Sequence, residues 1–394
     1  MPTGCADPEL RVTGMRAWLR MAGLVFALCG IPGLLPAQAR VATRTQHVIL
    51  VMTDGFRWQE VFNGADDALL TRAEGNVADT AGLRRDFGRG SASERRAALL
   101  PFVWGTMAAK GQLFGDSARG SVAQIRNPLK FSYPGYSETF TGHVDPRIDS
   151  NGHPANANVT VFEWLNRRPA YRGKVAAFAT WDAFTRIINA GRSGVPVFDG
   201  WERGGVTGTR TGRESAMRDL FATTVRYWPD NNFDALTHFA MLDYLAVRKP
   251  KVLFIGYGET DEWAHAGRYD LYLRSAHQVD AYLAQLWATV QADPQYRDRT
   301  TLIVTTDHGR GYGAKWRDHG QDVVGAENIW MAVLGPDTPA LGARANVPVV
   351  YQAQVAATIA AFLGEDWQNA ERRAAAVLPG VGDALSRRRP ARTP

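Results

Sequence analysis

The sequence predicts an α/β protein built on a doubly wound, mostly parallel central sheet with helices on both faces. Two observations predict this class. Apolar, β-branched runs recur along the 394 residues without polar alternation, as strands buried on both faces do. Segments with apolar residues at three-to-four spacing lie between these runs, and this alternation of strand and helix indicates a doubly wound fold. We also expect loop insertions over the carboxyl edge of the sheet.

Individual elements follow from the same two patterns. The expected strands are residues 47–54, 174–180, 251–257, 301–306 and 328–334. The expected helices are residues 94–110, 159–168, 215–227, 233–247, 268–291 and 352–363. Asp54, Asp261 and Asp307 come just beyond strand ends. Because ligands of such sheets bind beyond the carboxyl ends of the strands, we expect one functional site there.

The first 39 residues have the pattern of a signal peptide with an upstream extension. Residues 15–20 are basic, residues 21–35 are mostly apolar, and Ala37-Gln38-Ala39 is a small-x-small cleavage site. A membrane anchor is the alternative, but the apolar run is short and interrupted by Gly and Pro. We therefore expect a periplasmic or secreted protein, cleaved near Ala39, without a transmembrane span in the mature chain.

Composition restricts the chemistry of any site. Both cysteines, Cys5 and Cys29, lie in the segment expected to be removed, so the mature chain needs neither disulfides nor thiolate ligands. Any metal must therefore be held by Asp, Glu and His. The formal net charge of +6 is moderate, and no nucleic-acid-binding module is evident. The sequence leaves the oligomeric state open.

The rest of the chain divides into a main domain and a tail. The main domain covers residues 40–366, and an arginine-rich terminus predicts a basic, solvated tail over residues 367–394. Residues 182–228 are rich in Gly and Arg and form a candidate substrate-facing insertion. A plain surface insertion explains this composition equally well.

Aspartates and histidines beyond the strand ends have the composition of a two-metal site. Asp261 and His265 are four residues apart, so on a helical turn both side chains can grip one ion. Asp307 and His308 directly follow a strand, and adjacent side chains that point apart suit two neighbouring ions. Six oxygen and nitrogen ligands are what two Zn²⁺ ions need, with Mn²⁺ and Fe as open alternatives. The predicted ligands are Asp54, Asp261, His265, Asp307, His308 and His319.

The segment 130–138 supplies a candidate nucleophile. Ser132 precedes a Tyr-Pro-Gly turn, and we place it at a loop-to-helix junction, where free backbone N–H groups attract anions. Beside two metal ions, one ion lowers the pKa of the attacking hydroxyl and the other stabilises the leaving oxygen of a phosphoryl transfer. Ser137 competes for this role, and Ser132 is preferred because the proline-containing turn follows it.

Taken in chain order, the motifs that contain these residues resemble those of the alkaline phosphatase superfamily. The similarity is greatest to the branch of nucleotide pyrophosphatase/phosphodiesterases and related exported alkaline phosphatases, which commonly has Thr in place of Ser132. It covers about residues 45–365. The motifs are Thr53-Asp54-Gly55-Phe56-Arg57, Phe131-Ser132-Tyr133-Pro134-Gly135-Tyr136, Asp261 with His265, Asp307-His308-Gly309 and His319-Gly320.

The resemblance implies an alkaline phosphatase-like catalytic domain with assigned roles. It gives one zinc ion to Asp261, His265 and His319, and the other to Asp54, Asp307 and His308. Ser132 would bridge to the second ion and form a covalent phosphoserine, which metal-activated water hydrolyses. An Asn after the nucleophile often binds a phosphate oxygen in this family. Asn151 is our candidate, with Asn156 and Asn158 as alternatives.

The implied activity is hydrolysis of a small phosphate ester, as a phosphomonoesterase or phosphodiesterase. A sulfatase-like hydrolase is one alternative, but sulfatases carry Arg where this chain has Tyr136. Cofactor-independent phosphoglycerate mutases share the metal motifs, yet they are cytosolic and carry a large inserted domain. A catalytically silent metal-binding envelope protein is another alternative. It would be expected to lack a ligand or the nucleophile, and none is missing.

Overall fold

The computed structural model describes residues 43–201 and 212–381. The predicted signal peptide, the insertion residues 202–211 and the tail from residue 382 lie outside this part. Within the described ranges, no helix combines the length and the apolar character needed to cross a membrane.

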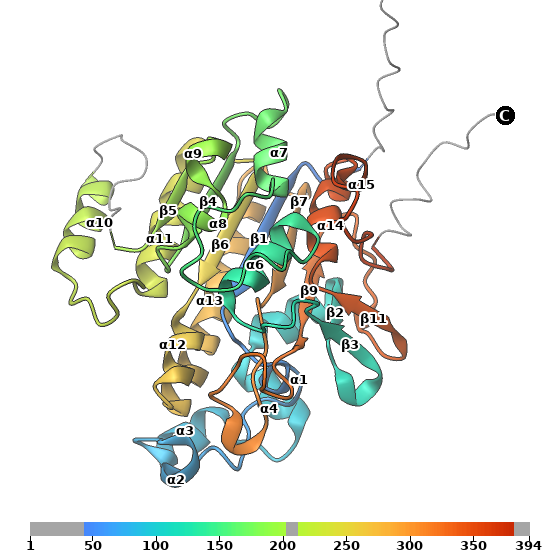
Figure 1. The fold of residues 1–394 in the computed structure, drawn as a ribbon. Coiled ribbons are helices and arrows are strands. Elements are labelled where there is room, and N and C mark those ends of the chain that lie inside the picture. Colours follow the sequence, from blue (N-terminus) through green and yellow to red (C-terminus); the bar gives the residue numbers. More distant parts are fainter. Residues whose placement is uncertain (1–42, 202–211, 382–394) are drawn as a thin grey trace, which may run out of the picture. The chain divides into compact units, whose positions relative to one another are not determined.

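An eight-stranded sheet lies at the centre of the structure (Figure 1), in the order β10-β2-β9-β7-β1-β6-β4-β5. The strands are β1 (His47–Thr53), β2 (Gln112–Phe114), β4 (Val175–Ala179), β5 (Val197–Asp199), β6 (Val252–Tyr257), β7 (Thr300–Thr305), β9 (Met331–Leu334) and β10 (Gly342–Ala343). β1 runs parallel to both β6 and β7, and of these eight strands β9 alone is antiparallel to its neighbours. The mostly parallel central sheet is confirmed.

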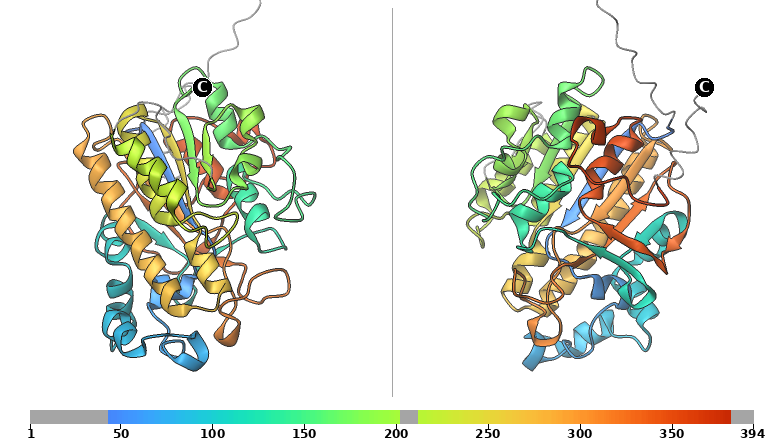
Figure 2. Two further views of the ribbon diagram at one scale, coloured as in Figure 1. Left: turned by 90° about the vertical axis from the view of Figure 1, so that its left-hand side faces the viewer. Right: turned by 45° about the vertical axis from the view of Figure 1, so that its right-hand side comes forward.

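Helices cover both faces of the sheet, as Figure 2 shows from two sides. Alternate residues of β1 enter separate buried clusters: Ile49 and Val51 enter one, and Val48, Leu50 and Met52 enter the other. The first cluster includes residues of α1 (Trp58–Asn63), α3 (Thr80–Phe87), α4 (Ala92–Leu99), α10 (Gly212–Thr223), α11 (Asp234–Arg248) and α13 (Tyr269–Ala292). The second includes residues of α6 (Ser132–Thr141), α7 (Val161–Arg167), α8 (Phe184–Ile187), α14 (Gln354–Phe362) and α15 (Trp367–Ala370). The doubly wound arrangement is therefore confirmed.

All five expected strands exist, but residues 328–334 are divided between two sheets. β8 (Asn328–Ile329) joins β3 (Ser121–Gln124) and β11 (Val347–Tyr351) in a separate three-stranded sheet, whereas β9 joins the central one. The sequence did not predict β2, β3, β5, β10 and β11, because these short segments carry no long apolar run. The shorter helices α2 (Arg72–Gly75), α5 (Ala108–Lys110) and α9 (Ala190–Ser193) complete the connections.

The helix expected over residues 94–110 is interrupted. α4 ends at Leu99, and a π-helical turn (Val103–Met107) and α5 follow. Pro101 has no backbone N–H to continue the helix. The N–H groups of the next two residues donate instead to the buried Asp280 carboxylate, at 2.7 and 2.9 Å.

The predicted tail boundary at residue 366 is wrong. Trp367 is 2% exposed, and its indole N–H donates to the Thr141 carbonyl at 2.8 Å. Leu378 and Val381 are buried in the second cluster. The boundary was predicted too early because the arginine run near the terminus indicated a solvated tail. The apolar residues that precede this run are instead packed in the core. The main domain therefore extends at least to residue 381.

The segment 182–228 contributes to the central sheet. It contains α8, α9 and the edge strand β5 before the undescribed residues, and α10 after them. It is therefore only partly a loop excursion. Whether it faces a substrate stays a prediction.

Candidate metal and nucleophile site

The predicted ligands meet at the carboxyl edge of the sheet. β7, β1 and β6 are adjacent and parallel, so the segments that follow them emerge side by side. Asp54 follows β1, Asp307 and His308 follow β7, and helix α12 (Glu259–His265) follows β6. The sheet order thus brings together residues that are about 250 positions apart in the chain.

Asp54, Asp307 and His308 form what we call the inner group. They are 6%, 0% and 0% exposed, and their ligand atoms lie within 4.8 Å of one another. His308 Nε2 is 3.4 Å from both Asp54 Oδ1 and Asp307 Oδ2. None of these three atoms makes a hydrogen bond within the described chain. Buried polar atoms without partners are costly, and one cation could satisfy all three. The residues therefore fit a divalent ion.

The other polar atoms of the inner group are held by neighbours. The Gly55 N–H donates to Asp307 Oδ1 at 3.0 Å, and the Tyr136 hydroxyl donates to Asp54 Oδ2 at 3.0 Å. His308 Nδ1 lies 3.0 Å from the carbonyl of the next residue. Each ligand is thus fixed at one atom and free at another, as metal ligands typically are.

Two side chains of the inner group have strongly shifted pKa values. Burial and the neighbouring Asp54 raise the pKa of Asp307 to about 7. Burial lowers the pKa of His308, but the carboxylates of Asp307 and Asp54 outweigh it and raise that pKa to about 9. Two carboxylates in one buried space thus attract positive charge, which protons or a metal ion can supply.

Asp261, His265 and His319 form what we call the outer group. His265 Nε2 lies 3.1 Å from Asp261 Oδ2 and 3.0 Å from His319 Nε2. The His265 side chain is 49% exposed, so this group is open to solvent. His319 Nδ1 lies 3.1 Å from the Lys130 carbonyl, which can only accept a hydrogen bond. That contact places the proton on Nδ1 and leaves Nε2 of His319 available as a ligand.

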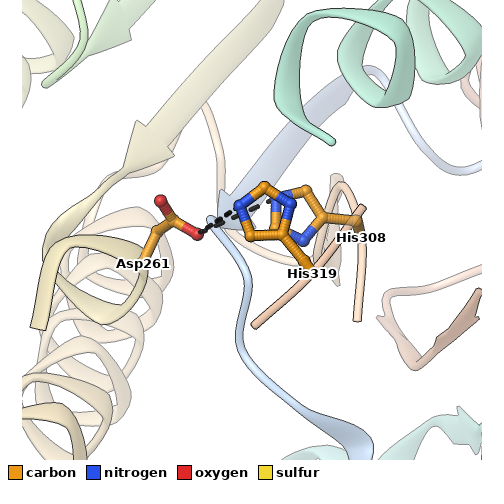
Figure 3. A group of neighbouring side chains, drawn as sticks. All are labelled: Asp261, His308 and His319. Atoms are coloured by element: carbon orange, nitrogen blue, oxygen red, sulfur yellow. Dashed lines mark ion pairs between the residues drawn. The ribbon is translucent and has the colours of Figure 1, made fainter. Parts of the chain in front are cut away.

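His308 lies between the two groups. Its Nε2 is 3.8 Å from Asp261 Oδ1, and His319 Nε2 is 3.9 Å from the same oxygen (Figure 3). The His308 and His319 rings stack with centroids 4.0 Å apart. Burial and the nearby His308 lower the pKa of both His265 and His319, which favours the neutral rings that metal binding requires.

Ser132 is the first residue of α6 and is 6% exposed. The expected Tyr-Pro-Gly turn is instead the first turn of this helix, because Pro134 occupies a position whose N–H has no partner within the helix. The junction itself is as predicted: Phe131 is extended, and its own side chain does not cap the helix. Pro134 has no N–H, and the N–H groups of Tyr133 and Gly135 have acceptors, so the Ser132 N–H is the group that remains for an anion at this terminus.

Asn151 lies at the same helix terminus, where its Oδ1 accepts a hydrogen bond from the Tyr133 N–H at 3.0 Å. The alternatives have other partners. Asn156 donates to the Ser137 hydroxyl at 3.0 Å, and Asn158 donates to Asp145 at 2.7 Å. Asn151 is thus the asparagine of the three that the structure brings beside Ser132. The buried Ser137 is bonded within the core.

Helix α6 closely approaches the inner group. A Cβ at Gly135 would lie 2.4 Å from the Asp307 carbonyl oxygen. Gln352, which follows β11, donates to the same oxygen at 2.9 Å and to the Thr306 carbonyl at 2.8 Å. The Gly135 contact and the Tyr136–Asp54 hydrogen bond place the start of α6, the helix that begins with Ser132, beside the inner group.

Sequence reasoning missed Arg310. Its side chain is fully buried and contacts Asp261. The one signal in the sequence that could have identified it is its place two residues after His308. Arg57, the last residue of the first motif, is also buried, and it forms an ion pair with Glu60.

A sheet of this order, with two Asp–His groups and a helix-terminal hydroxyl at its carboxyl edge, defines a hydrolase of the alkaline phosphatase superfamily. Enzymes of this class use divalent metals. The profile of the type I phosphodiesterase / nucleotide pyrophosphatase family matches residues 134–354, more than half of the chain. The chain therefore belongs to that family, and the predicted resemblance is confirmed.

A solved structure shows the same fold. Ps i-CgsB is 15% identical with a TM-score of 0.52, and the match covers 87% of this chain and 77% of that chain. Phosphonate monoester hydrolase SpPMH from Silicibacter pomeroyi is 14% identical with a TM-score of 0.49, over 89% of this chain and 78% of that chain. A comparison with curated protein sequences found no match.

Proposed function

We propose that this protein is an exported two-metal hydrolase that cleaves phosphate esters through a phosphoserine at Ser132. The observation that carries the proposal is the inner group, whose three unbonded buried atoms lie beside the helix that begins with Ser132. Ions held by the inner and outer groups would lower the pKa of the attacking hydroxyl and stabilise the leaving oxygen. We propose zinc for both, because every available ligand is a carboxylate or an imidazole.

The chain's own residues bind and orient the phosphate. The Ser132 N–H at the start of α6 attracts its oxygens, and the side-chain NH₂ of Asn151 at the same terminus provides a further donor. The Ser132 oxygen attacks phosphorus, the bond to the leaving oxygen breaks, and the phosphoryl group stays on Ser132 until water attacks it.

Tyr136 supports a phosphate rather than a sulfate ester. A sulfatase would carry Arg at this position, but here the buried tyrosine hydroxyl holds the carboxylate of Asp54. A sulfatase-like hydrolase therefore stays the second choice, and a silent metal-binding protein the third.

Aromatic residues beside the outer group favour a diester. Trp263 lies between Asp261 and His265 in α12, and its ring is 5.4 Å from Tyr227 and 4.8 Å from Trp228. Aromatic side chains can pack against the second ester group of a diester. A monoester has a charged oxygen in place of that group and needs nearby cations instead. The family match to phosphodiesterases agrees with this preference.

The test is turnover by the zinc-loaded mature chain of bis-p-nitrophenyl phosphate, p-nitrophenyl phosphate and p-nitrophenyl sulfate. We expect the diester to be cleaved fastest and phosphate to be trapped on Ser132 in a peptide mass spectrum. Ser132→Ala should abolish turnover, whereas Ser137→Ala should retain it. Activity that survives Ser132→Ala would exclude this nucleophile, and faster cleavage of the sulfate would exclude the substrate class. Mass spectrometry of the protein recovered outside the cytoplasm tests cleavage near Ala39.

A further inference from the structure

We propose that Arg310 is a positioning residue that ties the ligand-bearing segments together and sets the affinity of the outer group for its metal ion. This inference rests on the proposed function, because it concerns the same two groups. Arg310 lies two residues after His308 in the chain, and its side chain is fully buried.

One guanidinium contacts three segments that carry predicted ligands. Nε donates to the Gly55 carbonyl at 3.0 Å, directly after Asp54. Nη2 donates to Asp261, to its carboxylate Oδ1 and also to its carbonyl at 3.3 Å. Nη1 donates to the Arg317 carbonyl, two residues before His319. With His308 two residues away in the chain, Arg310 cross-links all the segments that surround both groups.

Asp261 Oδ1 is the oxygen that faces His308 and His319. It lies 3.8 Å from His308 Nε2 and 3.9 Å from His319 Nε2, and it also accepts from Arg310. The other oxygen, Oδ2, lies 3.1 Å from His265 Nε2. Arg310 thus fixes the rotation of the Asp261 carboxylate, and with it the direction in which each oxygen meets the outer group.

The chain makes room for this arrangement at Gly55. Gly55 has φ of +59°, and a Cβ there would lie 2.6 Å from Asp261 Oδ1, 2.8 Å from Arg310 Nη2 and 2.9 Å from its Nε. Any other residue would displace the guanidinium or the carboxylate. Glycine is thus required both by the backbone conformation and by the space that Arg310 occupies.

Arginine suits this role because its donors lie in a rigid planar fork. A lysine ammonium carries the same charge but is compact and cannot reach three separated acceptors together. Residues that orient metal ligands typically change metal affinity by about 10- to 100-fold when they are replaced. Arg310→Lys therefore separates the fork geometry from the charge.

The experiment measures zinc binding by the mature chain and by two variants. Arg310→Lys removes the fork. Arg57→Lys makes the same change at a buried arginine that pairs with Glu60 and contacts no predicted ligand. Zinc is titrated in competition with a chromogenic chelator, zinc content per chain is measured by plasma mass spectrometry, and kcat and KM are recorded at rising free zinc.

We expect Arg310→Lys to lower the affinity for one of the two zinc ions by about tenfold or more. The affinity for the other ion should not change. The kcat of this variant should recover as free zinc rises, which a general loss of structure would not allow. Arg57→Lys should bind both ions as the parent does. Parental affinity for both ions in Arg310→Lys would overturn the inference. A parent chain that binds no zinc would overturn the proposed function itself, and this inference with it.

Gly55→Ala provides a second variant in case Arg310→Lys fails to fold. It keeps the arginine but places a methyl group where the guanidinium lies. The same selective loss of one zinc ion is expected, and parental affinity for both ions in this variant would likewise overturn the inference.

Discussion

The inner and outer groups differ in how each is supported by the fold. The inner ligands lie directly at strand ends, are buried, and have three atoms without hydrogen bonds. The outer ligands lie on helix α12 and a loop, His265 is half exposed, and its ring contacts Asp261 and His319. The inner group therefore depends on a cation, whereas the outer group can partly satisfy itself. We expect the inner ion to bind more tightly and the outer ion to exchange.

The largest expected effect comes from removing one ligand from each group. Asp54→Asn keeps the volume of the side chain but removes an inner ligand charge, so we expect activity to fall about a thousandfold or more, because metal stabilisation supplies several kcal/mol. His265→Ala should cost about 10- to 100-fold and should be partly restored by excess zinc. Steady-state kinetics over a range of free zinc measure both.

Circular dichroism and thermal melts in chelator verify that both variants fold. Equal losses in the two variants, or rescue of Asp54→Asn by zinc, would remove the distinction between the groups.

The second effect is a dependence of stability on pH that belongs to the inner group. The folded chain binds protons at Asp307 and His308 more tightly than the unfolded chain does, with pKa values of about 7 against 3.8 and about 9 against 6.5. Their contribution to folding is therefore fully present below the unfolded values and is lost as the pH rises through the folded ones. The metal-free protein should lose several degrees of Tm between pH about 6 and pH about 8.5.

Zinc replaces these protons, so it should raise the Tm more at the alkaline pH than at the acid one. Differential scanning fluorimetry with zinc or chelator measures both trends. Asp54→Asn serves as the control, because without this carboxylate the Asp307 pKa falls towards its usual range and the slope flattens. A zinc-induced rise in Tm that is larger at acid pH would contradict the account.

The third effect tests how closely α6 approaches the inner group. In Gly135→Ala the new methyl group would lie 2.4 Å from the Asp307 carbonyl oxygen, so helix and ligand segment must move apart. We expect a loss of about 1–3 kcal/mol in unfolding free energy, as overpacking typically causes, together with reduced kcat. Urea denaturation and kinetics measure these. Gly105→Ala is the matched control, because a Cβ there meets nothing within 4 Å. Equal stability losses would show that α6 and the Asp307 segment can move apart without cost.

The sequence predicts the residues of both groups from short motifs, and those of the inner group stand directly after long apolar runs. Their positions beyond strand ends predicted one common site, because ligands of parallel sheets bind there. The strand order, which makes β7, β1 and β6 neighbours and so brings Asp54 and Asp307 together, was not predicted. The distinction between a buried group and an exposed one was not predictable. It depends on how α12 and the loop before His319 pack above the sheet.

Contacts between distant segments account for the rest of what was missed. Arg310 acts on residues about 50 and about 250 positions away, and no local pattern marks it. Trp367 was assigned to a tail because the arginine-rich terminus predicts a solvated segment, and a single apolar side chain does not predict burial. The role of Gly135 follows from a close approach to Asp307 rather than from a turn.

The smallest expected effect tests the support of the inner group at a single hydrogen bond. Tyr136→Phe removes the hydroxyl that donates to Asp54 Oδ2 at 3.0 Å and leaves a second atom of that carboxylate without a partner. We expect zinc affinity of the inner group to fall about tenfold, with little change in the outer group. Tyr133→Phe is the matched control, because this neighbouring hydroxyl in the same helix donates to the Pro154 carbonyl at 2.7 Å and to no ligand. Chelator competition should separate the two variants. If both bind zinc alike, the inner group does not depend on this hydrogen bond, and its tighter binding must come from burial and charge alone.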